Sequence, residues 1–372
     1  MSDIVFYQNG KSFESFQSDQ GKYSLVKMNS VNFDGVFKES GKFIDLEAQT
    51  LLKDDIIMIV SDIGFGNLIG LCGVIPENNK YVLNTHTALL RLNQLENNSI
   101  YVQNFINKNQ PYFKKNCLGM SQLHITKSSI LDFPIYTPFI AEQVKIGKNL
   151  RFVLDIFESS IKIIEFKIVL KQTLLSKLLI KNNSSLPDFR FKGFEDEWTY
   201  KSWSEIVEKI SKNSNDNTLP KLEYEDIDKG NGVLNKDISN KFDNRKGILF
   251  EPGDVLFGKL RPYLKNWWLA EFIGIALGNF WVMKPLNNDS NFVFNLLQTN
   301  RFKEVSNLTF GTKMPSSDWS LVSEQTFAIP SLSEQVKIGR LFKLLDKLIN
   351  LQKQEINILQ NLKKTAMKML LV

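Results

Sequence analysis

The chain has few of the residues from which disulfide frameworks and metal sites are built. Its 372 residues include two cysteines, Cys72 and Cys117, and two histidines, His86 and His124. Two cysteines exclude a disulfide framework, and so few histidines leave a zinc site poorly supplied. Apolar runs such as 56–60 fall far short of the roughly 18 residues that cross a bilayer. The N-terminus also lacks the regions of an export signal, so we expect a cytoplasmic protein that has no membrane partner and no metal site.

Motifs of catalysis are equally scarce. Residues 62–70 form a glycine-rich stretch, but a strand-like segment follows it, and a phosphate-binding loop needs a helix N-terminus there. Residues 132–136 are similar to the Asp-Pro-Pro-Tyr motif of adenine methyltransferases, yet they lack its adjacent prolines. Glu165 and Lys167 have a nuclease-like spacing, but positions i and i+2 of a helix point in different directions. The sequence therefore predicts no catalytic residue.

The sequence does contain an internal repeat. Residues 142–147 and 334–339 both read Glu-Gln-Val-Lys-Ile-Gly, at a shift of 192 positions. A looser match joins residues 52–57 to residues 250–255. Such a period is far too long for a solenoid. We interpret the chain as a tandem duplication in which each copy is a globular module followed by a long helix.

Two segments show the periodicity of a coiled coil. After Pro138 and after Pro330, apolar residues recur at alternating steps of three and four, with Lys171 and Gln352 as polar interruptions. This alternation gives the period of 3.5 residues that is typical of coiled-coil packing. About 40 residues make a helix of about 60 Å. The predicted seam between the two helices consists of Leu154, Phe157, Ile161, Ile164, Leu345, Leu348, Leu359 and Leu362.

The modules themselves have a different pattern. Short apolar runs alternate with Gly, Asn and Asp turns, which favours β-rich domains and an α+β fold overall. The polar stretch from Lys181 to Pro187 has no periodicity and is interpreted as a connector. The expected organisation is a first module at 1–138, a central helix at 139–181, a linker at 182–186, a second module at 187–330 and a C-terminal helix at 331–372.

Positive charge is unevenly distributed along the chain. The net charge is +6, but residues 139–181 hold eight Lys and Arg against four Asp and Glu, and residues 331–372 hold eight against three. The remaining chain is net negative, so the overall charge is weak evidence for nucleic-acid binding. Residues 258–268 combine three cations with three aromatic residues. Arg can read guanine edges and Lys can contact phosphates, but Trp267 and Trp268 are equally suited to a core.

Three motifs carry a resemblance to a known family. They are residues 186–194 with Trp198 at the head of the second module, residues 252–256 within it, and residues 329–335 at the start of the second helix. With the repeat, these motifs resemble the specificity subunit of a Type I restriction-modification system. The first module departs from the family pattern because it lacks the motif of residues 187–194, and we expect either a shortened N-terminal head or a diverged one.

The resemblance implies a non-catalytic subunit with two target-recognition domains and two long antiparallel coiled-coil helices that separate them. Each domain would read one half of a bipartite, asymmetric site in double-stranded DNA. The helices would dock two methyltransferase subunits and, through them, the restriction and translocase subunits. S-adenosylmethionine, ATP and magnesium would belong to those partners, and this chain would hold no cofactor.

Candidate DNA contacts follow from the basic segment and from position in the repeat. A competing hypothesis is a non-catalytic coiled-coil scaffold that binds only proteins and reads no DNA. The net charge of −3 outside the two helices favours that alternative. A single-chain enzyme has no supporting motif. The candidates are Lys259, Arg261, Lys265, Thr312 and Lys313 in the second module, and Ser61, Asn67, Ser121 and Gln122 in the first.

Overall fold

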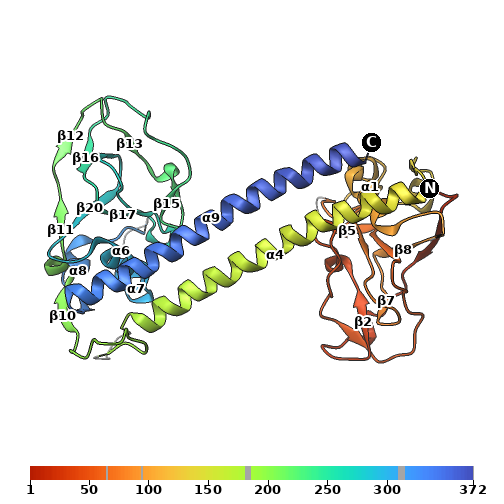
Figure 1. Ribbon diagram of the computed structural model, residues 1–372, viewed down its shortest axis with the longest axis horizontal. Coiled ribbons are helices and arrows are strands. Elements are labelled where there is room, and N and C mark those ends of the chain that lie inside the picture. Colours follow the sequence, from red (N-terminus) through yellow and green to blue (C-terminus); the bar gives the residue numbers. More distant parts are fainter. Residues whose placement is uncertain (64–65, 94, 181–185, 309–314, 372) are drawn as a thin grey trace. The chain divides into compact units, whose positions relative to one another are not determined.

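The protein divides into two compact units that share its two long helices. In this computed structural model, unit 1 is Met1–Ile161 with Glu355–Val372, and unit 2 is Lys162–Gln354. Helices α4 (Ile140–Leu178) and α9 (Leu332–Leu370) have 39 residues each (Figure 1). The predicted α+β fold with two long helices is confirmed. The described residues are 1–63, 66–93, 95–180, 186–308 and 315–371.

Unit 1 contains two main sheets. Every residue of strand β4 (Ile56–Ile59) is buried, as expected for a strand covered on both faces. The first sheet has the order β1-β8-β4-β6, with β1 at Val5–Asn9, β8 at Thr87–Leu92 and β6 at Cys72–Val74. The second has the order β3-β2-β7, at Phe43–Ile44, Tyr23–Val26 and Tyr81–Leu83. The other elements are β5 (Ser61–Ile63), β9 (Gln122–His124), α1 (Ser99–Lys108), α2 (Gln110–Lys115) and α3 (Lys127–Leu131).

Unit 2 repeats this plan. One sheet has the order β11-β20-β17-β18, at Val207–Ile210, Phe280–Pro285, Val255–Gly258 and Trp267–Leu269. Another has the order β12-β16-β19-β13, at Asn213–Ser214, Gly247–Phe250, Gly274–Ala276 and Lys221–Leu222. Two further two-stranded sheets pair β10 (Thr199–Ser202) with the distant β21 (Thr326–Ile329), and β14 (Ile227–Asp228) with the nearby β15 (Val233–Leu234). The helices are α5 (Trp203–Ile206), α6 (Ser290–Gln298), α7 (Asn300–Ser306) and α8 (Trp319–Ser323).

The duplication inferred from the sequence is visible in this topology. In both units a four-stranded antiparallel sheet has the same strand order, and a parallel strand pair joins a second sheet, β2 with β7 and β13 with β19. In both units a helix follows the last strand of the first sheet, and an Asx side chain caps it. Asn98 accepts a hydrogen bond from Tyr101 N in α1, and Asp289 accepts one from Phe292 N in α6.

The repeated glutamine links each long helix to its domain. In unit 1, the buried Gln143 accepts a hydrogen bond from Asn98 N (3.0 Å) and donates one to Pro138 O (2.7 Å). In unit 2, Gln335 accepts from Asp289 N (3.0 Å) and donates to Pro330 O (3.0 Å). Each glutamine therefore satisfies the N-cap backbone of α1 or α6 and the turn that begins its own helix.

The repeated glycine allows a close helix approach. A Cβ at Gly147 would lie 2.6 Å from Asn98 Oδ1, and a Cβ at Gly339 would lie 2.3 Å from Asp289 Oδ1. Both contacts are shorter than real Cβ atoms tolerate, so a larger residue at either position would displace the side chain that caps α1 or α6. The shared Glu-Gln-Val-Lys-Ile-Gly stretch is thus the joint between each globular domain and its helix.

The two long helices run antiparallel within each unit. In unit 2, Lys167 Nζ donates to Gln352 Oε1 at 2.7 Å. In unit 1, Ser160 Oγ donates to Glu355 Oε1 at 3.1 Å. Still in unit 1, Lys363 Nζ lies 5.6 Å from the centroid of the Phe157 ring. Residues with higher sequence numbers on α9 contact residues with lower sequence numbers on α4, so the two helices are antiparallel.

The seam of α9 differs from the sequence prediction at two positions. Leu348 is 47% exposed and Leu362 is 51% exposed, whereas Ile349 and Lys363 are buried. The prediction was wrong at Leu348 because Leu345 is followed by apolar residues at both the third and fourth positions, and the fold uses the fourth. It was wrong at Leu362 because the fold buries Lys363 instead, whose ammonium donates to Asp34 Oδ1 at 2.7 Å. Leu154, Phe157 and Leu345 are buried, and Ile161, Ile164 and Leu359 are partly buried.

Candidate nucleic-acid interface

The basic segment of unit 2 is a strained loop between β17 and β18. Arg261 and Lys265 flank a short 3-10 helix (Pro262–Leu264), and both have φ in the left-handed region, at 52° and 57°. Residues with a Cβ rarely adopt this conformation, and such strain is concentrated at binding sites. Backbone hydrogen bonds hold the loop: Arg261 N donates to Pro315 O at 2.8 Å, and Gly230 N donates to Lys265 O at 3.0 Å.

The loop separates its cations from its tryptophans. Trp267 and Trp268 are each 3% exposed, so they belong to the core, one of the two alternatives that the sequence left open. Arg261 is exposed, and among the described residues no ion pair involves its guanidinium. Lys259 is partly buried, and its backbone bonds Asn279 and Ser317. The structure therefore anchors the loop through its aromatic end and leaves Arg261 available to a ligand.

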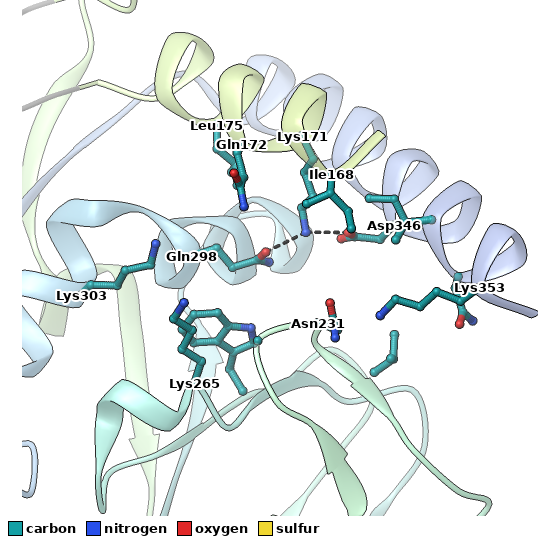
Figure 2. Close-up of a pocket in the computed structure, with 15 residues that line it drawn as sticks. Ile168, Lys171, Gln172, Leu175, Asn231, Lys265, Gln298, Lys303, Asp346 and Lys353 are labelled. Carbon is teal, nitrogen blue, oxygen red and sulfur yellow. Dashed lines mark hydrogen bonds and ion pairs between the residues drawn. The ribbon is translucent and has the colours of Figure 1, made fainter. Parts of the chain in front are cut away.

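Lys265 points away from the loop into a pocket of unit 2. Figure 2 shows its ammonium group directed toward that of Lys303 on α7. The pKa of Lys303 is lowered, first by burial and then by the positive charge of Lys265. Two cations that share a partly enclosed pocket repel one another, so an anion bound between them would be stabilised. Gln172 and Asn231 also line this pocket and add polar groups to it.

A buried ionic cluster closes one wall of the same pocket. Lys171 Nζ donates to Gln298 Oε1 at 2.7 Å and pairs with Asp346 Oδ1 at 2.5 Å (Figure 2). Burial raises the pKa of Asp346, although the neighbouring Lys171 charge opposes that shift. Lys171 interrupted the apolar pattern of the sequence, and the structure shows that it crosses the seam to join α4, α6 and α9.

Unit 1 carries the matching edge with different chemistry. Ser61 pairs with His124 in the β5–β9 ladder, and the corresponding bridge of unit 2 joins Leu260 to Ser316. Gln122 Nε2 donates to Ser61 Oγ at 3.0 Å and lies 3.4 Å from His86 Nδ1. The structure therefore brings Ser61 and Gln122 together.

The other two candidates of unit 1 flank that pair. Ser121 and Asn67 are exposed, and the Asn67 carbonyl accepts a hydrogen bond from Gln110. Where unit 2 has Arg261, unit 1 has Asp62, whose carboxylate accepts a hydrogen bond from Leu68 N at 3.0 Å. The glycine-rich stretch that contains Asn67 leads from β5 into β6, as the sequence predicted, and not into a helix.

Some candidates are missing from this picture, and some members of the site were not predicted. Thr312 and Lys313 lie outside the described residues. Lys303, His86 and Gln172 were missed because no motif marks them and only the fold places them beside Lys265 or Gln122. Among the described residues, no group of three or more His, Cys, Asp and Glu side chains is arranged to hold a metal ion. None of the helices described is long and apolar enough to cross a membrane.

Comparisons with known proteins identify the family. The family model for the Type I restriction modification DNA specificity domain matches residues 1–168 and 195–361. The MjaVIII specificity subunit of Methanocaldococcus jannaschii is 22% identical over 100% of this chain and 91% of its own length. The EcoDI specificity subunit of Escherichia coli is 33% identical over 94 residues, which is 24% of this chain and 20% of that protein.

Solved structures agree on the fold. The S subunit of a Type I restriction-modification system from M. genitalium aligns with a TM-score of 0.69 at 16% identity, over 100% of this chain and 94% of that one. A chain from a structure that describes complex assembly and conformational transition of the type I R-M system aligns with a TM-score of 0.52 at 14% identity. The alignment covers 100% of this chain and 96% of that one. Two copies of the family domain, two long helices and this likeness over the full length agree: the chain belongs to the specificity subunits of Type I restriction-modification systems.

Proposed function

We propose that each unit reads one half of a bipartite, asymmetric target in double-stranded DNA. The observation that carries this proposal is the edge shared by both units, where one presents the exposed Arg261 and the other presents the exposed Gln122, whose amide donates to the buried Ser61. Arginine can pair with guanine O6 and N7, whereas an amide suits adenine N6 and N7. Equivalent positions with different donors and acceptors would read different bases.

Phosphate contact would come from the pocket between Lys265 and Lys303. DNA phosphates supply the anion that this pair of cations favours. Such contacts position a protein on the duplex and are insensitive to sequence. Arg261 and the lysine pair would thus have separate roles, the first in base readout and the second in affinity.

The long helices would dock the methyltransferase subunits. Both carry excess positive charge, and both leave large apolar side chains exposed. Phe152 and Phe166 on α4 are 67% and 66% exposed, and Leu344 on α9 is 60% exposed. Exposed apolar side chains beside charged ones are suited to a protein interface. S-adenosylmethionine, ATP and magnesium would bind to the methyltransferase and restriction subunits, which leaves this chain to recognise DNA and to assemble the complex.

The test is to reconstitute the chain with its methyltransferase subunits and to map the methylated positions on DNA. Exchanging residues 187–330 for the corresponding module of another family member should change one half of the methylated sequence and leave the other half unchanged. Methylation of the original sequence after the exchange would contradict the proposal. DNA retention that survives deletion of either module would instead support a scaffold that binds only proteins.

A further inference from the structure

The edge of unit 1 that contains Ser61 and Gln122 is a small antiparallel ribbon. In the pairing of β5 with β9, Ser61 lies opposite His124 and Ile63 lies opposite Gln122. On its other side, His124 pairs with Leu118 through two backbone hydrogen bonds, from Leu118 N to His124 O at 2.8 Å and from His124 N to Leu118 O at 2.9 Å. Strand β9 therefore lies between β5 and the backbone at Leu118.

The two faces of this ribbon have opposite character. Successive side chains of a strand alternate between faces, and directly opposite residues share one. On one face Asp62 is buried and Leu123 packs against the core of unit 1. Ile63 is 68% exposed and Leu118 is 54% exposed, although both are apolar. The exposed face, called the ribbon face here, consists of Ile63, Leu118, Gln122 and His124.

The surroundings of the ribbon face are basic. Residues 114–127 include three lysines and no acidic residue. Lys114 and Lys115 are exposed in the last turn of α2, just before Leu118, and the exposed Lys127 follows β9. In the turn between Leu118 and Gln122, Met120 is 100% exposed. Exposed apolar side chains among cations and uncharged polar groups are suited to a polyanion that also offers apolar groups.

The major groove of DNA offers such groups at one base only. The groove admits a two-stranded β-ribbon, and thymine alone presents a methyl group there, at its C5 position. The other groups that distinguish the bases in this groove are hydrogen-bond donors and acceptors. An aliphatic side chain placed against those polar groups would desolvate them without replacing their hydrogen bonds, which is unfavourable. Ile63 and Leu118 would therefore favour a thymine over every other base.

We propose that Ile63 and Leu118 contact the C5-methyl groups of thymines in the half-site of unit 1, beside the base that Gln122 reads. This inference rests on the proposed function, because it assumes that unit 1 reads DNA with this edge. The ribbon face then selects A·T pairs by apolar contact, and the amide of Gln122 reads polar atoms next to them. Pro262 follows Arg261 in unit 2 as Ile63 follows Asp62 in unit 1, and Pro262 is buried. The position of Ile63 thus provides a methyl contact in unit 1 alone.

The experiment replaces thymine by uracil, which lacks only the C5-methyl group. The half-site of unit 1 is the half that stays unchanged when residues 187–330 are exchanged. Each of its thymines is replaced in turn, and the affinity of the reconstituted complex for the duplex is measured. At one or more positions uracil should weaken binding about 4-fold, the equivalent of the about 0.8 kcal/mol gained by burying one such carbon group.

Variants of the ribbon face then assign each methyl contact to a side chain. The penalty for uracil at a given thymine should be lost in Ile63→Ala or in Leu118→Ala, whichever side chain contacts that methyl group. The matched control Phe33→Ala removes another exposed apolar side chain of unit 1, which is 73% exposed, and should keep the full penalty. Because Ile63 and Leu118 are exposed, their replacement should leave the fold intact.

Four results would overturn the proposal. They are a half-site of unit 1 without an A·T pair, no penalty for uracil in the wild-type complex, a penalty that persists in both variants, and weaker assembly with the methyltransferase subunits in Ile63→Ala at an unchanged penalty. The last result would make the ribbon face a protein contact. Each of them can occur while Gln122→Ala still relaxes this half-site, so the inference can fail while the proposed function stands.

Discussion

Replacing Gly339 by alanine tests the joint between domain and helix. Helix propensity alone predicts that the variant is more stable, whereas the close contacts at this joint predict that it is less stable. Alanine is normally preferred to glycine inside a helix by about 1 kcal/mol, so an unconstrained glycine in α9 would be a site of easy stabilisation. At Gly339, however, the new Cβ would lie 2.3 Å from Asp289 Oδ1, 3.0 Å from Asn291 Cβ and 3.1 Å from Phe292 N. Two of these atoms form the N-cap hydrogen bond of α6.

The magnitude follows from two costs and one gain. Overpacking of a closely packed site costs about 1–3 kcal/mol. Displacing the Asp289 side chain costs about 1 kcal/mol, because Phe292 N loses its cap. The helix preference of alanine returns about 1 kcal/mol. The sum is a destabilisation of about 1–3 kcal/mol, opposite in sign to the effect expected from helix propensity alone.

Urea denaturation followed by circular dichroism measures this change, with the midpoint compared between wild type and variant. Gly147→Ala in unit 1 is the matched replicate, since its Cβ would lie 2.6 Å from Asn98 Oδ1. Both variants should have lower midpoints with an unchanged slope. A higher midpoint for either one would refute the explanation of the repeated glycine.

Other perturbations test the buried charges and the proposed phosphate site. Lys171→Met should destabilise the chain by about 3 kcal/mol, because it leaves Asp346 partly buried and unpaired. Since burial raises the pKa of Asp346, folding favours its protonated form, and the deficit should shrink as the pH falls from 8 toward 5; a deficit that grows would contradict this sign. Arg245 and Lys241 lower the pKa of Glu223 to about 2, so the stability difference between wild type and Glu223→Gln should disappear as the pH falls from about 4.5 to about 2; a constant difference in acid titration would exclude the pairing. Lys303→Met should reduce the slope of log affinity for DNA against log salt by about 1 without changing sequence preference; an unchanged slope removes Lys303 from the DNA contacts.

The duplication and the helices could be predicted because they rest on local signals. The identical residues at 142–147 and 334–339, and the period of 3.5 residues between apolar side chains, can be seen in the sequence itself. The register of α9 was harder, because Leu348 and Ile349 are both apolar and only packing against α4 chooses between them. Polar seam residues such as Lys171 gave no signal of burial, since their partners come from distant parts of the chain.

The candidate site divides in the same way. Arg261 and Lys265 were found because they lie close together in the sequence, and Gln122 because it lies at the repeat position of the same edge. Lys303 was not found, because it comes from α7 and meets Lys265 only in the folded unit. The basic composition of a loop is visible in a sequence, whereas the side chains that complete a pocket across elements are not.

The most direct test of the account replaces the proposed base-reading side chain of one unit at a time. The measurement is the set of methylated sequences produced by the reconstituted complex that carries Arg261→Ala, Gln122→Ala or the control Lys284→Ala, an exposed lysine on β20. Loss of a bidentate base contact should cost about 1–3 kcal/mol of discrimination. The account predicts that Arg261→Ala relaxes one half-site, Gln122→Ala relaxes the other half-site, and Lys284→Ala relaxes neither. Relaxation of the same half-site by Arg261→Ala and Gln122→Ala, or no relaxation by either, would contradict it.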